Sequence, residues 1–201
     1  MWNTVALEGN PLSRDQVQRI LIDEAAAPSA VSDPEVQQVQ DCATAFQWLL
    51  TAVKTRTFTG GRRDSDRCNQ LLVAREALNA GHFRSGEVGV ELGHRGRYRP
   101  PASRQLEAIY AQGMAALATI GDPVLRAMVY FPFAARSQFY FDGNKRTARM
   151  IMNGHLLSAG AALIDVPMAR KADFDRACVT MFADGDATEI LAFLAECQAL
   201  P

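Results

Sequence analysis

The sequence predicts a mainly α-helical fold with one β-hairpin, on the strength of three features. Apolar residues recur at helical spacing in several segments, as at Val39, Ala43 and Phe46, and this spacing gives each segment one apolar face. Helix start signals precede several of these segments, for example Asp122 before a proline. Convincing alternation of apolar and polar residues is confined to residues 81–101, so we expect the hairpin there.

The composition is that of one globular domain. The chain has 201 residues, 48% of them hydrophobic and 21% charged, and its formal net charge is −1. A chain of this length buries a substantial core without disulfides or metals. A charge so near zero gives no general attraction to nucleic acid or to anionic lipid. We therefore expect a single domain over residues 1–201 and neither nucleic acid nor a membrane as partner; the oligomeric state stays open, a homodimer included.

The sequence also indicates a cellular location. No apolar run approaches the length of a transmembrane helix, and Met1-Trp2-Asn3 opens no secretory signal. The four cysteines have no Cys-x-x-Cys spacing, so they indicate neither a zinc site nor a disulfide framework. A reducing, cytoplasmic location fits these features best.

Helix boundaries follow from caps and breakers along the chain. Ser13 and Gln16 form a capping-box pattern, and Ser32 is the expected N-cap of a long helix that ends before Thr59. Small residues at 25–30 are expected to link these two helices. Four arginines around the start of the next helix are expected to lie in solvent, namely Arg56, Arg62, Arg63 and Arg67. The expected helices cover approximately residues 13–21, 34–58, 65–80, 103–118, 122–135, 144–159, 171–183 and 187–199.

Residues 138–149 carry the most informative pattern, Gln-Phe-Tyr-Phe-Asp-Gly-Asn-Lys-Arg-Thr-Ala-Arg. Gly143 permits a sharp turn, and Asn144 is a good N-cap for the helix that should follow. A loop that closes onto a helix N-terminus gathers free N–H donors and partial positive charge, which together favour phosphate. This stretch therefore predicts an anion site.

Charged side chains in the same stretch support a polyphosphate ligand. Arg146 and Arg149 are three residues apart and share one helical face, so both guanidinium groups can converge on one anion. Asp142 is suited to hold Mg²⁺, the usual companion of polyphosphate. The alternative interpretation is a capped helix with a solvated basic first turn.

These residues resemble the signature of the Fic fold (the Fic/Doc family), His-x-Phe-x-(Asp/Glu)-Gly-Asn-(Gly/Lys)-Arg-x-x-Arg. Residues 142–146 and Arg149 match it in register, Tyr140 takes the Phe position, and Gln138 takes the position of the catalytic His. The resemblance implies a Fic-type helical bundle with one β-hairpin flap. It also implies an enzyme that moves AMP from ATP to a protein Ser, Thr or Tyr hydroxyl. By resemblance, Asp142 would hold Mg²⁺, and the phosphates would be bound by Gly143, Asn144, Lys145, Arg146 and Arg149.

A second motif lies near the start of the chain. Thr4, Glu8 and Gly9 match Ser/Thr-x-x-x-Glu-Gly/Asn, which resembles the inhibitory motif of Fic proteins. The resemblance makes residues 1–31 an inhibitory segment followed by a helix, with Glu8 paired to Arg149. A carboxylate in a guanidinium fork excludes the phosphate that would otherwise use it. Without the resemblance, Glu8 is expected to lie in solvent near a turn.

Residues 81–101 resemble the family's flap. The hairpin follows a Gly-x-Phe/Tyr-Arg element at Gly81, Phe83 and Arg84, and residues 93–96 form its turn. The resemblance implies that the flap docks an extended segment of a target protein as an added strand, and it makes residues 122–201 the signature-bearing core. The expected docking residues are Val88, Val90, Leu92 and Tyr98. The alternative is a hairpin that merely covers one edge of the core.

Gln138 is the main departure from the signature. In the family the histidine takes the proton of the target hydroxyl, whereas a carboxamide has no useful basicity near neutral pH. The three histidines of the chain are expected elsewhere: His82 and His94 in the flap region, and His155 more than two turns along the helix. Loss of a general base costs about 10²–10⁴-fold in rate, so weak transfer remains compatible with the sequence.

Lys145 is a second departure, because adenylylating members have Gly there. A lysine at this position is similar to the Doc toxins, in which the reversed nucleotide supports phosphoryl transfer. The sequence thus leaves three classes open. These are a Fic-type transferase of AMP or phosphate, a non-catalytic protein that binds nucleotide or a partner as a regulator, and an enzyme for a phosphorylated small molecule.

Overall fold

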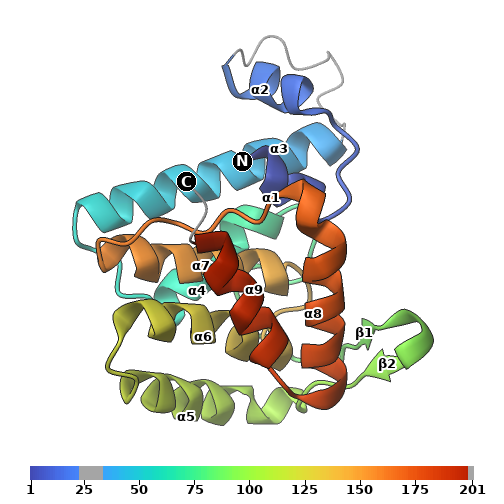
Figure 1. Cartoon of the computed structure of the whole chain (residues 1–201), viewed down its shortest axis with the longest axis vertical. Helices are drawn as coiled ribbons and strands as arrows, with labels where there is room; N and C mark the ends of the chain where they lie inside the picture. Colours follow the sequence, from blue (N-terminus) through green and yellow to red (C-terminus); the bar gives the residue numbers. More distant parts are fainter. Residues whose placement is uncertain (23–33, 199–201) are drawn as a thin grey trace.

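The computed structural model describes residues 1–22 and 34–198. These residues form a bundle of helices with one short hairpin at its edge (Figure 1), which confirms the predicted fold class. None of the described helices is both long and apolar enough to cross a membrane. The helices are α1 (Trp2–Ala6), α2 (Arg14–Ile22), α3 (Pro34–Lys54), α4 (Arg62–Val73), α5 (Leu106–Ala118), α6 (Pro123–Ser137), α7 (Asn144–Ser158), α8 (Lys171–Asp184) and α9 (Thr188–Gln198); the strands are β1 (Val90–Glu91) and β2 (Arg97–Tyr98).

Helix α7 is the centre of the bundle. It packs against α6, α4 and α3, and its Ile151, Met152 and Leu156 are fully buried. Its end follows the predicted signal, since Gly160 adopts a φ of 75° directly after the C-cap, a conformation that glycine reaches without steric cost. The position of α7 fixes the loop that precedes it.

Two predicted helix starts are confirmed by their hydrogen bonds. The N–H of Ser13 donates to Oε1 of Gln16 at 2.8 Å, and the N–H of Gln16 donates to Oγ of Ser13 at 3.3 Å. Oδ1 of Asp122 accepts from the N–H groups of residues 124 and 125 at 2.8 and 3.2 Å. The predicted cap at Ser32 and the linker at 25–30 lie outside the described residues.

The predicted helices differ from the structure mainly at α1 and α4, and α3 ends at Lys54 instead of near residue 58. Residues 2–6 form the short helix α1, which the sequence pattern did not indicate. Helix α4 runs from residue 62 to 73 instead of 65 to 80. It begins early because Oδ2 of Asp64 accepts from the N–H groups of Thr59 and Gly60 at 2.7 and 2.9 Å. It ends early because the chain turns back, and the N–H of Gly81 reaches Oδ1 of Asn69 at 2.9 Å.

Arg62 is not the solvated residue that the sequence indicated. Its Nε lies 2.7 Å from Asp66 and its Nη1 lies 2.8 Å from Glu107. The guanidinium carbon also stands 3.2 Å from the centroid of the Phe83 ring. Arg62 thus ties α4 to α5 and to the segment before the hairpin. Arg56, Arg63 and Arg67 are exposed, as predicted.

The hairpin is confirmed but short. Its strands pair antiparallel, with Val90 opposite Tyr98 and Glu91 opposite Arg97. The N–H of Leu92 donates to the carbonyl of residue 96 at 2.7 Å. Figure 1 shows the hairpin projecting from the bundle beside α8.

Candidate functional site

Residues 138–143, the signature loop, connect α6 to α7 through a tight turn. Gln138 is the C-cap of α6 and adopts φ 49° and ψ 59°, a left-handed conformation that is uncommon for non-glycine residues and recurs at functional sites. Gly143 is the N-cap of α7 with a φ of 73°. A Cβ there would stand 2.7 Å from Cγ1 of Val73. Both the conformation and the space therefore require glycine.

The side chain of Gln138 is folded into the loop. Its Nε2 donates to the carbonyl of Ala135 at 2.7 Å, and its Oε1 accepts from Nδ2 of Asn144 at 3.2 Å. The residue is 9% exposed. At the position of the family's histidine, the chain thus has a carboxamide that braces the loop and lacks a basic atom.

Asn144 was predicted to cap α7, but it is the first residue of that helix and Gly143 is the cap. Its side chain points back into the loop instead. Oδ1 of Asn144 accepts from the N–H of Tyr140, and Nδ2 donates to the carbonyl of Tyr140, both at 2.9 Å. Asn144 therefore holds the signature loop closed through its two hydrogen bonds to the Tyr140 backbone, while Gly143 ends the turn.

Glu8 contacts Arg149, as the resemblance implied. Oε1 of Glu8 lies 3.0 Å from Nη1 of Arg149, and Nη2 of Arg149 lies 3.4 Å from the carbonyl of Thr4. Nζ of Lys145 stands 3.9 Å from the other carboxylate oxygen of Glu8. Burial alone would raise the pKa of Glu8, but the charges of Arg149, Lys145 and Arg146 outweigh it, and the pKa is lowered. Glu8 is therefore a carboxylate at neutral pH.

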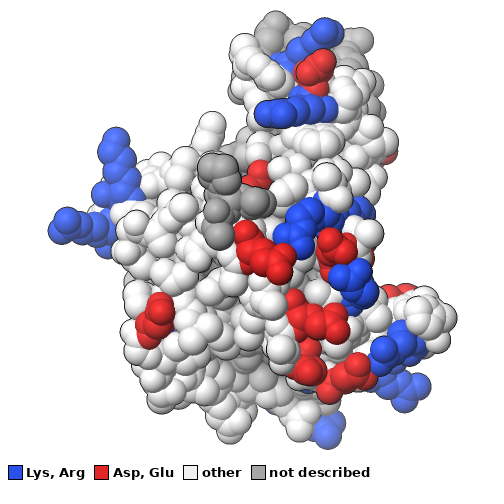
Figure 2. Space-filling model, viewed as in Figure 1, with Lys and Arg blue, Asp and Glu red and all other residues white. Residues whose placement is uncertain are grey.

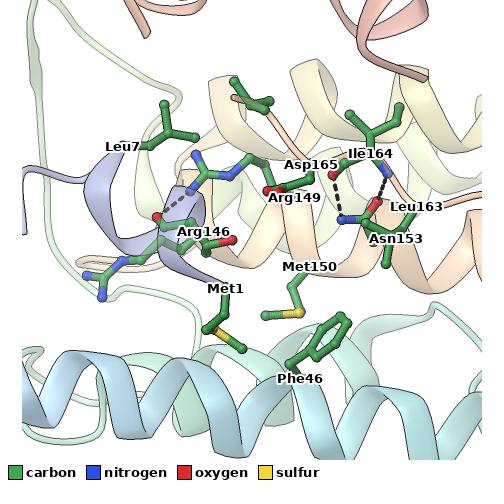
Figure 3. Close-up of a pocket in the computed structure, with 12 residues that line it drawn as sticks. Met1, Leu7, Phe46, Arg146, Arg149, Met150, Asn153, Leu163, Ile164 and Asp165 are labelled. Carbon is green, nitrogen blue, oxygen red and sulfur yellow. Dashed lines mark hydrogen bonds between the residues drawn. The ribbon is translucent and has the colours of Figure 1, made fainter. Parts of the chain in front are cut away.

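Arg146 is held by a different carboxylate. Its Nη2 lies 2.7 Å from Oε2 of Glu76, in the turn after α4. Burial lowers the pKa of Arg146, but Glu76 more than offsets this effect and the pKa is raised. In Figure 3 the guanidinium of Arg149 lies beside α1, whereas that of Arg146 points away from it. In this conformation the two arginines do not converge on one point.

A pocket of about 130 Å³ lies behind α1, between that helix, α3 and α7 (Figure 3). Its walls are mainly apolar, with Leu7, Phe46 and Met150 among them, and the stems of both arginines complete it. The contacts of α1 with the core are therefore incomplete on this side. Gly9, the last residue of the Thr4-x-x-x-Glu8-Gly9 pattern, is exposed with a φ of 89°.

Asp142 is exposed at the mouth of the signature loop. Its Oδ1 accepts from the N–H of Gly143 at 2.5 Å. The carboxylate keeps free coordination positions, which suits Mg²⁺ because that ion is commonly bound by one carboxylate together with phosphate oxygens. Within residues 1–22 and 34–198, no three His, Cys, Asp or Glu side chains gather as a metal site.

Arg84 is a site residue whose role the sequence did not reveal. Its side chain is fully buried, and Nε donates to the carbonyl of Gln138 at 2.6 Å. Nη1 and Nη2 donate to the carbonyls of Gly86 and Pro101 at 2.7 and 2.5 Å. One side chain thus joins both ends of the flap region to the signature loop. The Gly-x-Phe-Arg element marked this residue without indicating these partners.

Tyr140 also differs from its predicted role as a plain aromatic. It is 3% exposed, and its hydroxyl lies 2.8 Å from Oγ of Ser65 and 2.9 Å from Oδ1 of Asp66. Tyr140 therefore anchors the signature loop on α4. Phenylalanine, which the family pattern has here, has no hydroxyl for these bonds.

The expected docking residues of the flap differ in burial. Val88, Val90 and Tyr98 are half-buried and Leu92 is buried, and both Val90 and Tyr98 pack against the core. The Tyr98 hydroxyl donates to the carbonyl of Arg136 at 3.0 Å, and its ring lies 5.4 Å from that of Phe182. At the tip, Arg95 pairs with Asp184 at 2.6 Å. The hairpin is thus fastened to α6 and α8 at its base and tip.

The histidines belong to segments other than the signature loop. His82 and His94 are exposed in the flap region. His155 packs its ring against Phe58 and Tyr130, and burial lowers its pKa. None of the three contacts Gln138 through a hydrogen bond in the described part of the chain.

No family model matches this sequence. Solved structures of Fic proteins match the fold. A Fic-domain signalling protein from Bacteroides thetaiotaomicron aligns with a TM-score of 0.81 at 17% identity over 98% of this chain and 80% of its own. Fic-1 from C. elegans aligns with a TM-score of 0.78 at 22% identity over 97% of this chain and 58% of its own.

A third solved structure is more distant. The BepC effector from Bartonella tribocorum, determined with bound AMPPNP, aligns with a TM-score of 0.57 at 17% identity over 83% of this chain and 88% of its own. At these identities the alignments establish the fold. The chain described here has the Fic fold.

Proposed function

We propose that this chain is a Fic-type protein that binds ATP at the signature loop and is built to transfer AMP to a protein hydroxyl. In this proposal Glu8 inhibits the site and Gln138 slows the proton-transfer step. The observation that carries the proposal is the 3.0 Å contact between Glu8 and Arg149. A carboxylate in that position occupies the guanidinium fork that a phosphate would use.

The proposed reaction is a phosphoryl substitution at the α-phosphorus of ATP. The target hydroxyl oxygen forms a bond to that phosphorus, the bond to the β-phosphate bridging oxygen breaks, and pyrophosphate leaves. The hydroxyl proton must pass to an acceptor. Because Gln138 offers no basic atom, we propose that water or the departing pyrophosphate accepts the proton, which makes the transfer slow.

The ligand groups follow from the positions of the side chains. The N–H groups of Asn144 and Lys145 at the start of α7 suit a phosphate. Arg149 would bind a phosphate once Glu8 leaves it, and Arg146 would add positive charge nearby. Asp142 would hold Mg²⁺, which would supply positive charge beside the phosphates. The AMPPNP bound by the BepC structure of the same fold supports a nucleotide here.

We propose that the target protein docks at the hairpin as an extended segment. The outer edges of the two-stranded sheet leave backbone N–H and C=O groups that an added strand can use. Val88 and Val90 are half-buried and accessible for contact. Arg84 joins the flap region to the signature loop, so a docked segment would be held in fixed register with the site.

We also propose a reducing, cytoplasmic setting. The cysteines are all free and buried, namely Cys42, Cys68, Cys178 and Cys197. Free thiols of this kind are typical of reducing compartments. Whether two copies associate is a question for sedimentation of the purified protein.

A second function is favoured by one observation. Both polar atoms of the Gln138 side chain are engaged, with Ala135 and Asn144, so the residue acts as a brace. A protein that binds a nucleotide without transferring AMP needs a stable signature loop, which Gln138 supports, and does not need a general base. In this alternative the nucleotide releases α1 from Arg149 and thereby signals to a partner.

The two functions are separated by a transfer assay on the Glu8→Gly protein. It would be incubated with Mg²⁺ and ATP labelled at the α-phosphate, with and without cell lysate, and analysed by mass spectrometry. AMP on protein hydroxyls supports the transferase, and phosphate alone supports a Doc-like reaction. Saturable ATP binding by calorimetry without any modification supports the non-catalytic regulator.

A further inference from the structure

A second pocket lies where α3 ends and α4 begins. It has a volume of about 520 Å³, which is within the range of small-molecule sites. Trp48 contributes one wall from α3, and Arg63 and Arg67 contribute another from α4. We call it the basic pocket, defined by these three residues.

The basic pocket is separate from the signature loop. The segment at its edge includes Gly60, which packs against the ring of His155, so closely that a Cβ there would overlap the ring. His155 is in the last turn of α7. At about 1.5 Å per residue it lies roughly 16 Å along the helix from Asn144. A ligand in the basic pocket would therefore bind beside the opposite end of α7.

Positive charge exceeds negative charge in the lining of the basic pocket, which holds two arginines and one carboxylate. Arg63 and Arg67 are exposed and four residues apart on α4, so their side chains share one face. Neither forms an ion pair within the part of the chain that the structure describes, and Arg67 donates to Gln70 at 2.9 Å. The lining also includes Asp64, whose Oδ2 accepts from two backbone N–H groups and from Oγ1 of Thr59.

Further cations stand at the same end of the molecule. Lys54 is the last residue of α3, and Arg56 follows it; both are exposed. Figure 2 shows Lys and Arg side chains projecting at the left edge, beside the end of α3, without an acidic side chain among them. The net charge of the whole chain, −1, does not reveal this local excess of positive charge.

An aromatic wall beside two guanidinium groups that form no ion pair with the described residues selects a particular ligand chemistry. Trp48 is half-buried, so its indole is held in place while part of it stays accessible for stacking. Guanidinium groups bind phosphate through two parallel hydrogen bonds. We propose that the basic pocket binds a nucleotide, with its phosphate on Arg63 and Arg67 and its base stacked on Trp48. The source is either a free mononucleotide or the terminal nucleotide of a single strand, and this site is independent of the proposed transfer reaction.

Tryptophan fluorescence tests the proposal. The chain has two tryptophans, so Trp2→Phe leaves Trp48 as the reporter. AMP should quench it saturably, whereas adenosine and ribose 5-phosphate should each bind at least about five-fold more weakly, since each lacks one half of the recognition. Equal competition by inorganic phosphate would overturn the role of the ring.

Substitutions locate the site and separate it from the signature loop. Arg63→Gln with Arg67→Gln should weaken AMP binding by about ten-fold or more, whereas Arg104→Gln, an exposed arginine elsewhere, should not. Arg149→Ala should leave the Trp48 signal unchanged. Loss of that signal in Arg149→Ala, or its persistence in the double variant, would overturn the proposal. The same substitutions made in the protein that keeps Trp2 repeat the test, with AMP binding measured by calorimetry. This control removes any effect of the Trp2→Phe substitution itself.

A 5′-phosphorylated hexanucleotide RNA distinguishes the two sources. If it binds about ten-fold more tightly than AMP, the source is a single strand; if it binds equally, the source is the free nucleotide. Either result requires binding in the basic pocket, so either result supports the proposal. Duplex DNA binding as tightly as the single strand would contradict the proposal, because stacked bases cannot reach Trp48 and the attraction would be charge alone.

Discussion

Glu8 and Arg149 meet at 3.0 Å although 141 positions separate them in the sequence. The contact brings the segment that follows α1 onto the face of the central helix. It also sets the charge state of the site, because Arg149 and Lys145 keep the pKa of Glu8 lowered despite its burial. Any anion that uses Arg149 must first displace this carboxylate.

Replacing Glu8 with Gln should raise the affinity for ATP with Mg²⁺. The variant keeps the shape of the side chain but loses the negative charge that competes for Arg149. Charged hydrogen bonds contribute about 1.5–3 kcal/mol, so the affinity should rise by roughly ten-fold or more, measured by calorimetry. Glu107→Gln is the control, since its carboxylate is 76% exposed and pairs with Arg62. Equal affinities in the wild type and Glu8→Gln would mean that Glu8 does not restrain the site.

The same pair predicts a dependence of stability on pH. A carboxyl group whose folded pKa is lowered stabilises the fold above its unfolded pKa, and that stability is lost as pH falls through the folded pKa. The wild type should therefore melt above Glu8→Gln at neutral pH. The difference in melting temperature between the two proteins should close as pH falls below 4.5, the ordinary pKa of this carboxyl. Thermal unfolding followed by circular dichroism measures it. A gap that widens on acidification would contradict the lowered pKa.

Tyr140→Phe should destabilise the protein by about 1–2 kcal/mol in urea unfolding, because the hydroxyl is hydrogen-bonded to Ser65 and Asp66. Tyr110→Phe is the matched control. The Tyr110 hydroxyl is buried and has no hydrogen-bond partner in the described residues, so its removal should not destabilise the protein. A reversed order of the two variants would rule out Tyr140 as the anchor of the loop.

Arg84→Met should be more damaging. The substitution leaves the carbonyls of residues 86, 101 and 138 without their buried donor, at a cost of about 3 kcal/mol or more in unfolding free energy. Arg84→Lys keeps the positive charge and can donate to one of these carbonyls, so its loss of unfolding free energy should be intermediate. Arg99→Met, at an exposed arginine of the hairpin, serves as control. Full stability of Arg84→Met would show that the flap region is held by other contacts.

Local signals predicted the fold well. The Ser13–Gln16 box, Asp122 and Gly160 end or begin helices where the sequence indicated. Each of these signals acts within a few residues of itself, so the sequence displays it directly. The resemblance of the signature and of Thr4-x-x-x-Glu8 to family motifs also predicted the contact between Glu8 and Arg149. A family pattern can carry information on a contact between distant residues, which propensities and capping signals do not.

Contacts between distant segments were missed. Nothing near Arg146 indicates Glu76, and nothing near Arg84 indicates the carbonyls that it binds, because those partners come from other elements of the fold. Helix α1 was missed for a related reason. It has five residues, too few to be stable alone, and it is held by tertiary contacts such as Val5 in the core.

The most direct test of the central claim restores the missing base. In the proposed function the site is a restrained transferase whose proton acceptor has been replaced, so Gln138→His together with Glu8→Gly should lead to AMP on protein hydroxyls. The same pair should be tried with Lys145→Gly, because Lys145 lies beside the proposed phosphate positions. Mass spectrometry after incubation with ATP and Mg²⁺ should then show modification well above that of Glu8→Gly alone, by as much as about 10²-fold. If the triple variant is folded and binds ATP by calorimetry yet modifies neither itself nor any lysate protein, the transferase account is contradicted and the role is binding.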